Sequence, residues 1–274
     1  SIATIGLALQ DNYSANLAIE IPNLTEKYDI VLHAAGKAHS IPKTEEEKQA
    51  FFDVNLQGTK HLCTALEESG VPKSFIFVST VAVYGCDYGD NITEEHPLNG
   101  MTPYALSKIQ AEQYLQEWCN KHHVTLGIIR PSLIAGPNPP GNLGAMINGI
   151  RNGKYFSIAG GRARKSVLMV QDTANLIPLL AEQGGIYNVC DTYQPTFREL
   201  ESVICRQLGK SMPLSIPYWL AKSMAVVGDC LGSKAPINSL KLNKITKSLT
   251  FSNEKAMREL GWKPMNVLDN FKIE

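Results

Sequence analysis

The chain has 274 residues, of which 44% are apolar and 19% charged, and its 26 Lys and Arg balance its 26 Asp and Glu. This composition is typical of a folded globular protein and excludes a disordered chain. Balanced charge argues against sequence-independent nucleic-acid binding, which needs a basic excess. The longest uncharged run, residues 131–150, is rich in Pro, Gly and Asn. We therefore expect no membrane-spanning helix and no membrane partner.

The six cysteines are scattered and include no CxxC pair. This spacing favours reduced thiols over a disulfide framework or a zinc site, so we expect no bound metal. The N-terminal residues lack the basic, apolar, small-residue order of a signal peptide. A cytoplasmic protein is the expectation.

Short apolar runs recur along the chain and predict strands. They are residues 2–7, 29–33, 74–79 and 125–130. Runs that are apolar throughout are buried on both faces, as the strands of a parallel sheet are.

Helices are predicted between the strands, at 44–69, 103–121 and 196–209. Thr44 with Glu47, and Thr196 with Glu199, have the spacing of capping boxes, and Pro103 suits the first turn of a helix. Strands and helices in this order predict right-handed βαβ units and a doubly wound α/β fold with a parallel sheet.

The strongest chemical signal is Tyr104 with Lys108, because residues four apart share one face of a helix. The lysine charge and the nearby helix N-terminus are both expected to lower the pKa of the phenol. Such a tyrosine exchanges a proton with a sugar or alcohol hydroxyl near neutral pH. The same spacing also occurs in ordinary amphipathic helices, so the pair alone does not decide.

Ser79 and Thr80 follow the strand at 74–79. The carboxyl ends of parallel strands are where open α/β sheets bind ligands. A hydroxyl there can share a hydrogen bond with Tyr104 and a substrate oxygen, although capping the strand end is a simpler role. The two motifs in this order favour catalysis.

Six segments in order resemble the extended short-chain dehydrogenase/reductase family, in its nucleotide-sugar epimerase/dehydratase branch. They are Val31–Gly36, Asp53–Thr59, Val78–Gly85, Tyr104–Lys108, Arg130–Pro137 and Leu260–Pro264. The resemblance implies a Rossmann-like domain, a smaller mixed C-terminal substrate lobe, an NAD- or NADP-dependent enzyme and a homodimer.

The resemblance also implies roles for individual residues. The implied catalytic residues are Thr80, Tyr104 and Lys108. The implied cofactor-binding residues are Ala34, Ala35, Gly36, Asn55, Ser79, Tyr104, Lys108 and Pro131. The implied substrate-binding residues are Thr80, Asn142, Leu143, Arg164 and Lys165. Leu7 stands where a carboxylate would favour NAD, so NAD and NADP both stay open.

Two departures from the family pattern bear on function. No GxxGxxG segment precedes Ile2, so the chain resembles the family from its second strand onward, and we expect unpaired strand edges where a first strand and helix would lie. Val81 and Ala82 stand where dehydratases of the family carry an Asp-Glu pair, which argues against elimination of water.

The expected function is therefore an NAD(P)-dependent nucleotide-sugar epimerase that acts through a 4-keto intermediate, with polysaccharide biosynthesis as its setting. The alternatives are an NADPH-dependent reductase of a 4-keto nucleotide sugar, a sterol- or flavonoid-type alcohol dehydrogenase, and a non-catalytic dinucleotide-sensing protein. Net consumption of cofactor separates the epimerase from the first alternative.

We expect residues 1–135 and about 166–206 to form the dinucleotide-binding domain, and about 136–165 and 207–274 to form the substrate lobe. His33 is expected to be a packed residue at a strand end. Trp118, Trp219 and Trp262 are expected to pack in the core or between the lobes.

Overall fold

A computed structural model describes residues 2–8, 10–38, 40–139, 141–231 and 237–273. The chain divides into two compact units. Unit 1 comprises Ser1–Gly85, His96–Pro131 and Asn175–Tyr187, and unit 2 comprises Cys86–Glu95, Ser132–Ala174 and Asn188–Glu274. The unit boundaries differ from those of the two predicted domains, whose assignment stays a prediction.

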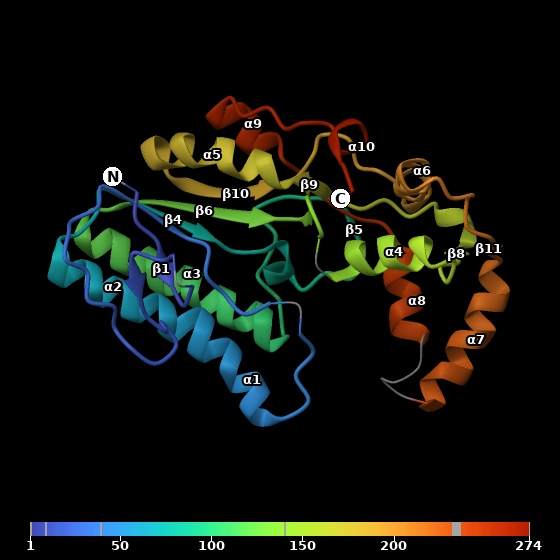
Figure 1. Ribbon diagram of the computed structural model, residues 1–274, viewed down its shortest axis with the longest axis horizontal. Coiled ribbons are helices and arrows are strands. Elements are labelled where there is room, and N and C mark those ends of the chain that lie inside the picture. The colour runs from blue at the N-terminus through green and yellow to red at the C-terminus, as the bar shows by residue number, and fades with distance from the viewer. Residues whose placement is uncertain (1, 9, 39, 140, 232–236, 274) are drawn as a thin grey trace. The chain divides into compact units, whose positions relative to one another are not determined.

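Unit 1 contains a four-stranded parallel sheet in the order β10-β6-β4-β3 (Figure 1). The strands are β3 (Ile30–His33), β4 (Ser74–Val78), β6 (Thr125–Pro131) and the start of β10 (Gly185–Val189). Three of the four runs predicted as strands therefore form neighbouring strands of one sheet. Parallel pairing brings their carboxyl ends to the same edge, where α/β sheets bind ligands.

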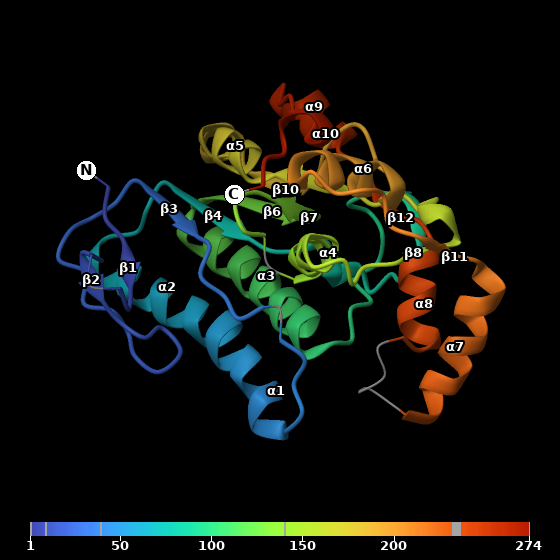
Figure 2. The ribbon, with the colours of Figure 1, turned by 45° about the vertical axis from the view of Figure 1, so that its right-hand side comes forward.

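Helices cover both faces of this sheet. They are α1 (Glu45–Phe52), α2 (Gly58–Ser69), α3 (Pro103–His122) and the second half of α5 (Val170–Gln183). Figures 1 and 2 show α2 and α3 on one face and α5 on the other. A π-helical turn, Asp53–Gln57, joins α1 to α2, so the helix predicted over 44–69 is continuous. The predicted doubly wound α/β fold is confirmed.

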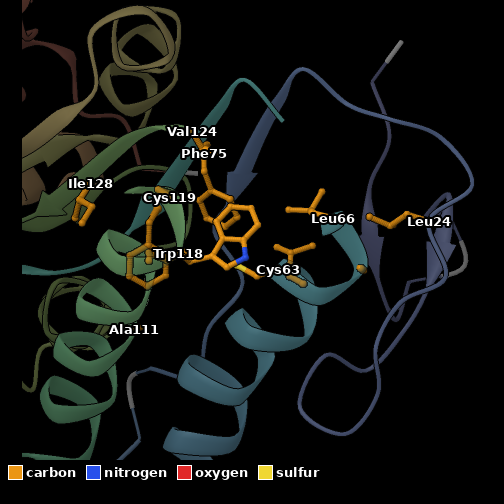
Figure 3. Close-up of a cluster of buried hydrophobic side chains, with 13 residues drawn as sticks. Leu24, Cys63, Leu66, Phe75, Ala111, Trp118, Cys119, Val124 and Ile128 are labelled. Atoms are coloured by element: carbon orange, nitrogen blue, oxygen red, sulfur yellow. The ribbon is translucent and has the colours of Figure 1, made fainter. Parts of the chain in front are cut away.

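The main core of unit 1 lies between the sheet and the helices α2 and α3 (Figure 3). Phe75 of β4 meets Trp118 of α3 edge to face, with ring centroids 6.1 Å apart. Trp118 is buried as predicted, and its indole nitrogen donates to Glu67 on α2. Packing of this kind fixes α3 against the strand whose end carries Ser79 and Thr80.

The N-terminal segment differs from the prediction. Within 2–7 only β1 (Ile5–Gly6) is a strand, and it pairs with β2 (Tyr13–Ser14) in a separate two-stranded sheet. Strand β3 lies at the edge of the main sheet, and Ile30 is exposed there. The expected unpaired edge is therefore present beside β3. A cavity of about 680 Å³ runs along it between the N-terminal segment and β3.

Unit 2 is built from short strands and helices around its own core. Its strands are β5 (Gly89–Ile92), β7 (Leu133–Ala135), β8 (Ser157–Ile158), β9 (Val167–Met169), β11 (Ser215–Ile216) and β12 (Leu249–Phe251). Its helices are α4 (Gly141–Arg151), α6 (Phe197–Leu208), α7 (Tyr218–Leu231), α8 (Ser239–Thr246), α9 (Glu254–Leu260) and α10 (Val267–Asn270). The strands join in pairs, β5 with β12, β7 with β9, and β8 with β11. The mixed architecture resembles the one predicted for the C-terminal lobe, but unit 2 is not the smaller of the two units.

Candidate active site

One face of α3 carries three polar residues at successive turns. Tyr104, Lys108 and Glu112 are spaced four apart, and Lys108 and Glu112 are buried. Thr102 caps the helix by accepting a hydrogen bond from the backbone nitrogen of Ala105. The cap fixes the start of α3 at Pro103, one residue before Tyr104. Two charged residues on the buried side of a helix are costly unless each has a partner.

Glu112 has its partner in Arg130 at the end of β6. The guanidinium donates to the two carboxylate oxygens at 2.6 and 3.1 Å. The hydroxyl of Ser79 also donates to Glu112, and Arg130 donates to the hydroxyl of Tyr84 at 3.0 Å. The network joins α3, the ends of β4 and β6, and the 3₁₀ turn Val81–Tyr84. It therefore fixes the helix against the end of the sheet.

The ammonium of Lys108 donates to the carbonyl oxygen of Val78 at 2.9 Å and lies 4.6 Å from the ring centre of Phe77. Burial lowers the pKa of Lys108 to about 8, although the nearby charge of Glu112 acts in the opposite direction. Lys108 thus has a pKa within reach of physiological pH, which an exposed lysine lacks.

Tyr104 differs from the sequence-based expectation of a lowered pKa. Burial raises the pKa of its phenol, and only a hydrogen bond with the side chain of Thr80 acts to lower it. The expectation was wrong in direction because it counted nearby positive charge and omitted burial. The structure does bring Thr80 and Tyr104 together, as catalysis requires. Thr80 also accepts a hydrogen bond from the backbone nitrogen of Ala82 at 3.1 Å.

Asn55 is buried beside the loop that follows β3. Its amide nitrogen donates to the hydroxyl of Ser107 at 2.9 Å and to the carbonyl of Lys37 at 3.1 Å, and its oxygen accepts from the backbone nitrogen of Lys37 at 2.7 Å. A Cβ on Gly36 would lie 3.0 Å from this oxygen and 3.1 Å from the Lys108 nitrogen. Glycine therefore allows the backbone after β3 to approach both side chains.

These residues form a setting that fits a dinucleotide. Ala34 and Ala35 line the cavity of about 680 Å³ beside β3. Gly36 is the next residue in the chain, and the side chains of Asn55 and Lys108 lie close to it in space. Pro131 ends β6 at the same edge of the sheet. His33 is buried at the end of β3 and shares a 3.0 Å hydrogen bond with Thr59, as expected for a packed residue.

The predicted substrate-binding residues other than Thr80 all lie in unit 2. Asn142 is exposed in the first turn of α4, while the side chain of Leu143 is buried in the unit 2 core. Arg164 donates to the carbonyl of Gln194 at 2.6 Å. Lys165 donates to the carbonyl of Lys247 at 3.1 Å, and burial lowers its pKa to about 8.

Sequence reasoning missed Glu112, Arg130 and Tyr84 as members of the site's framework. Glu112 and Arg130 each had a signal in the sequence. Glu112 continues the spacing of Tyr104 and Lys108 by one more turn, and Arg130 ends an apolar strand. Tyr84 stands in the Val78–Gly85 segment that carries the resemblance, but its hydrogen bond with Arg130 depends on the fold of the 3₁₀ turn.

Comparison with known proteins decides the family. The model of the NAD dependent epimerase/dehydratase family matches residues 15–190. The chain belongs to this family. The predicted membership, and with it the prediction of an NAD(P)-dependent enzyme, is confirmed.

Two relatives of the chain are enzymes of this kind. N-acetyl-alpha-D-glucosaminyl-diphospho-ditrans,octacis-undecaprenol 4-epimerase of Escherichia coli O157:H7 is 32% identical over 237 residues, covering 82% of this chain and 70% of the relative. dTDP-D-glucose 4,6-dehydratase of Mus musculus is 31% identical over 260 residues, covering 93% and 67%.

A crystal structure of UDP-glucose 4-epimerase from Thermotoga maritima with UDP-glucose has a similar fold. Its TM-score is 0.68 at 20% identity, and the match covers 88% of this chain and 74% of that one. At this identity the likeness supports the Rossmann fold and nothing finer.

The buried ion pair predicts a large and specific loss of stability. We expect Glu112→Gln to lower the free energy of unfolding by about 3 kcal/mol, because it leaves the buried Arg130 charge without its partner. Urea unfolding measures the change. The matched control is Glu117→Gln on the exposed side of α3, expected to change stability by less than about 0.5 kcal/mol.

The double variant Glu112→Met/Arg130→Met removes both charges. It should be more stable than Glu112→Gln, since no unpaired charge is left buried. Equal stability of Glu112→Gln and the Glu117→Gln control would contradict the structural role of the pair.

Proposed function

We propose that the protein is a 4-epimerase of a sugar carried on a diphosphate, with NAD or NADP as cofactor. The observation that carries this proposal is the meeting of Thr80 and Tyr104 one helical turn from the buried Lys108, at the carboxyl ends of β4 and β6. A surface Tyr-Lys pair needs no buried lysine, whereas proton transfer near neutral pH benefits from one.

Each of the three residues has a role in this proposal. Tyr104 takes the proton of the sugar 4-hydroxyl and returns it after the 4-keto sugar has turned over. Thr80 hydrogen-bonds the reacting oxygen beside Tyr104. Lys108, one helical turn further along α3, holds the ribose of the cofactor. When bound, the nicotinamide supplies the acceptor and donor of the hydride from C4.

The cofactor is assigned to residues around the ends of β3, β4 and β6. We propose that Ala34, Ala35 and Gly36 contact it with Asn55 behind them, and that Lys108 holds its ribose. Ser79 and Pro131 are the remaining residues proposed to contact the cofactor. The hydroxyl of Ser79 is already bonded to Glu112, so its contribution is through position and backbone. We assign no residue to the pyrophosphate, because the sequence contains no GxxGxxG segment.

The diphosphate of the substrate is assigned to unit 2. Arg164 and Lys165 are the positive charges that suit it, with Asn142 and the backbone of Leu143 as further contacts. A nucleotide sugar is the expectation from the sequence. The E. coli O157:H7 relative is named for a sugar on undecaprenyl diphosphate, which carries the same diphosphate group. Assays therefore offer both substrate types.

Epimerisation is favoured over dehydration, although a dehydratase is among the relatives. Val81 and Ala82 occupy the first positions of the 3₁₀ turn after Thr80, and neither side chain moves a proton. Elimination of water needs an acid and a base beyond Tyr104. A homodimer, a cytoplasmic location and a role in polysaccharide biosynthesis stay predictions.

Tyr104→Phe tests the proposed acid and base. We expect the variant to lose at least about a hundredfold in kcat, because the proton of the 4-hydroxyl has no acceptor. Fluorescence titration with NADH should still show saturable binding of the cofactor, so that the loss of turnover is a loss of the proton acceptor. Tyr114→Phe, on another side of the same helix, is the control and should keep its activity. Wild-type activity in Tyr104→Phe would refute the assignment.

A substrate deuterated at C4 separates epimerase from reductase. In an epimerase the same hydride returns to C4, so the product keeps the deuterium and no NADPH is consumed. Mass spectrometry and absorbance at the NADPH band measure the two quantities. Stoichiometric consumption of NADPH on a 4-keto sugar would replace the proposal with the reductase.

The pKa of Lys108 predicts the alkaline limit of activity. Since burial sets this pKa at about 8, the ammonium that is proposed to hold the cofactor ribose loses its charge above that pH. We expect kcat/KM to fall with a one-proton slope as the pH rises above about 8. A profile that stays flat up to pH about 9.5 would contradict a required charge on Lys108.

A further inference from the structure

Helix α7 exposes apolar side chains that the fold of unit 2 does not cover. Trp219 is 69% exposed and Val227 64%, although the sequence predicted Trp219 to be a packing residue. Trp118 and Trp262 are buried as predicted, so Trp219 is the exception among the three tryptophans. An exposed apolar patch of this kind indicates an interaction site.

The patch is one face of the helix. Ala221 and Ala225 are buried against Leu242 of α8, and the opposite face carries Trp219, Val226 and Val227. Both views show α8 beside α7 (Figures 1 and 2). Leu220 and Met224 extend the exposed face along the helix, and Leu240 adds to the exposed apolar surface from α8. A helix that is apolar on its outer face as well as its inner one needs a second apolar surface.

The charge around the patch indicates what that surface is. In the sequence, residues 210–247 contain six lysines and one acidic residue, Asp229, whereas the whole chain has no net charge. Lys234 lies outside the described residues, and Lys244 is paired with Asp87 at 3.3 Å. The carboxylate of Asp229 accepts hydrogen bonds from the backbone nitrogen and hydroxyl of Ser239, the first residue of α8, so its charge faces that helix start. Lys222 is exposed on α7 itself. Apolar and aromatic residues beside lysines are the chemistry of helices that lie on anionic membranes.

A basic cavity lies at the N-terminal end of α7. It measures about 410 Å³ and is lined by Tyr218, Arg162 and Lys247 among others. It places positive charge at the same end of α7 as Trp219.

We propose that α7 docks unit 2 on the surface of an anionic lipid bilayer, with Trp219, Val226 and Val227 in the headgroup region. The helix lies on the membrane and does not cross it. In the described part of the chain, no helix has the length and apolarity that a membrane span needs. The proposal departs from the expectation of no membrane partner, which rested on the lack of a spanning segment. It goes beyond the proposed epimerase activity and does not depend on it.

Co-sedimentation with vesicles tests the proposal without sugar or cofactor. The whole chain is mixed with phosphatidylcholine vesicles that contain roughly 30% phosphatidylglycerol, or with phosphatidylcholine alone. We expect sedimentation with the anionic vesicles only, reduced in about 0.5 M NaCl. The emission of Trp219 should shift to shorter wavelength on binding, because the other two tryptophans are already buried. In Trp219→Phe the shift should be lost while the vesicles still bind.

The decisive variant is Trp219→Ser/Val226→Ser/Val227→Ser, expected to bind anionic vesicles at least about tenfold more weakly. The control, Leu7→Ser/Ile19→Ser/Ile41→Ser, changes three exposed apolar residues of unit 1 and should bind as the wild type does. Circular dichroism verifies the folding of both variants.

Two results would overturn the proposal. One is the absence of wild-type binding to anionic vesicles, or binding that the α7 variant retains. The other is a patch that serves a second copy of the chain, in which case sedimentation velocity would show a wild-type dimer that the α7 variant converts to a monomer without any vesicle binding. Turnover of a water-soluble nucleotide sugar is measured separately, so loss of docking and loss of activity are distinguished.

Discussion

The buried pair of Glu112 and Arg130 is the interaction on which the candidate site depends. A charged pair out of water is tolerated only while its geometry is kept, so α3 has a single rotational position against the ends of β4 and β6. Tyr104 and Lys108 stand on the same face as Glu112. Their placement beside the sheet therefore follows from the placement of the ion pair, which touches no reacting atom in the proposed mechanism.

Local signals in the sequence predicted the elements well. Thr196 and Glu199 form the full capping box that their spacing predicts, and the helix ends at Gly209 with the positive φ of 63° that favours glycine. The capping box predicted at Thr44 forms only in part. The hydroxyl of Thr44 accepts a hydrogen bond from the Glu47 backbone nitrogen, but the Glu47 carboxylate accepts from the backbone nitrogen of Lys43 and not from that of Thr44. Both rest on interactions within one turn of chain, which sequence spacing reports directly.

Burial is what the sequence did not reveal, because it depends on residues far apart in the chain. The spacing of Tyr104 and Lys108 predicted their shared face correctly, yet the sign of the tyrosine's pKa shift was wrong. Lys108 is buried against the end of β4, where it donates to Val78, and the ring of Tyr104 lies 6.2 Å from that of Phe51 on α1. The segment 2–7 shows the same limit, since an apolar run predicts a strand and leaves its pairing partner open. In the structure β1 pairs with β2 and does not join the main sheet.

Helices α3 and α7 depart from the rule of apolar inside and polar outside in opposite senses. Helix α3 buries Lys108 and Glu112, and α7 exposes Trp219 and Val227. Each arrangement is unfavourable for folding alone, and residues that oppose folding concentrate where function requires them. A buried lysine with a pKa near 8 serves proton transfer, because its charge is both strong and adjustable there. An exposed apolar face serves contact with another apolar phase, because only such contact removes it from water. On this physical ground we propose chemistry for unit 1 and membrane attachment for unit 2.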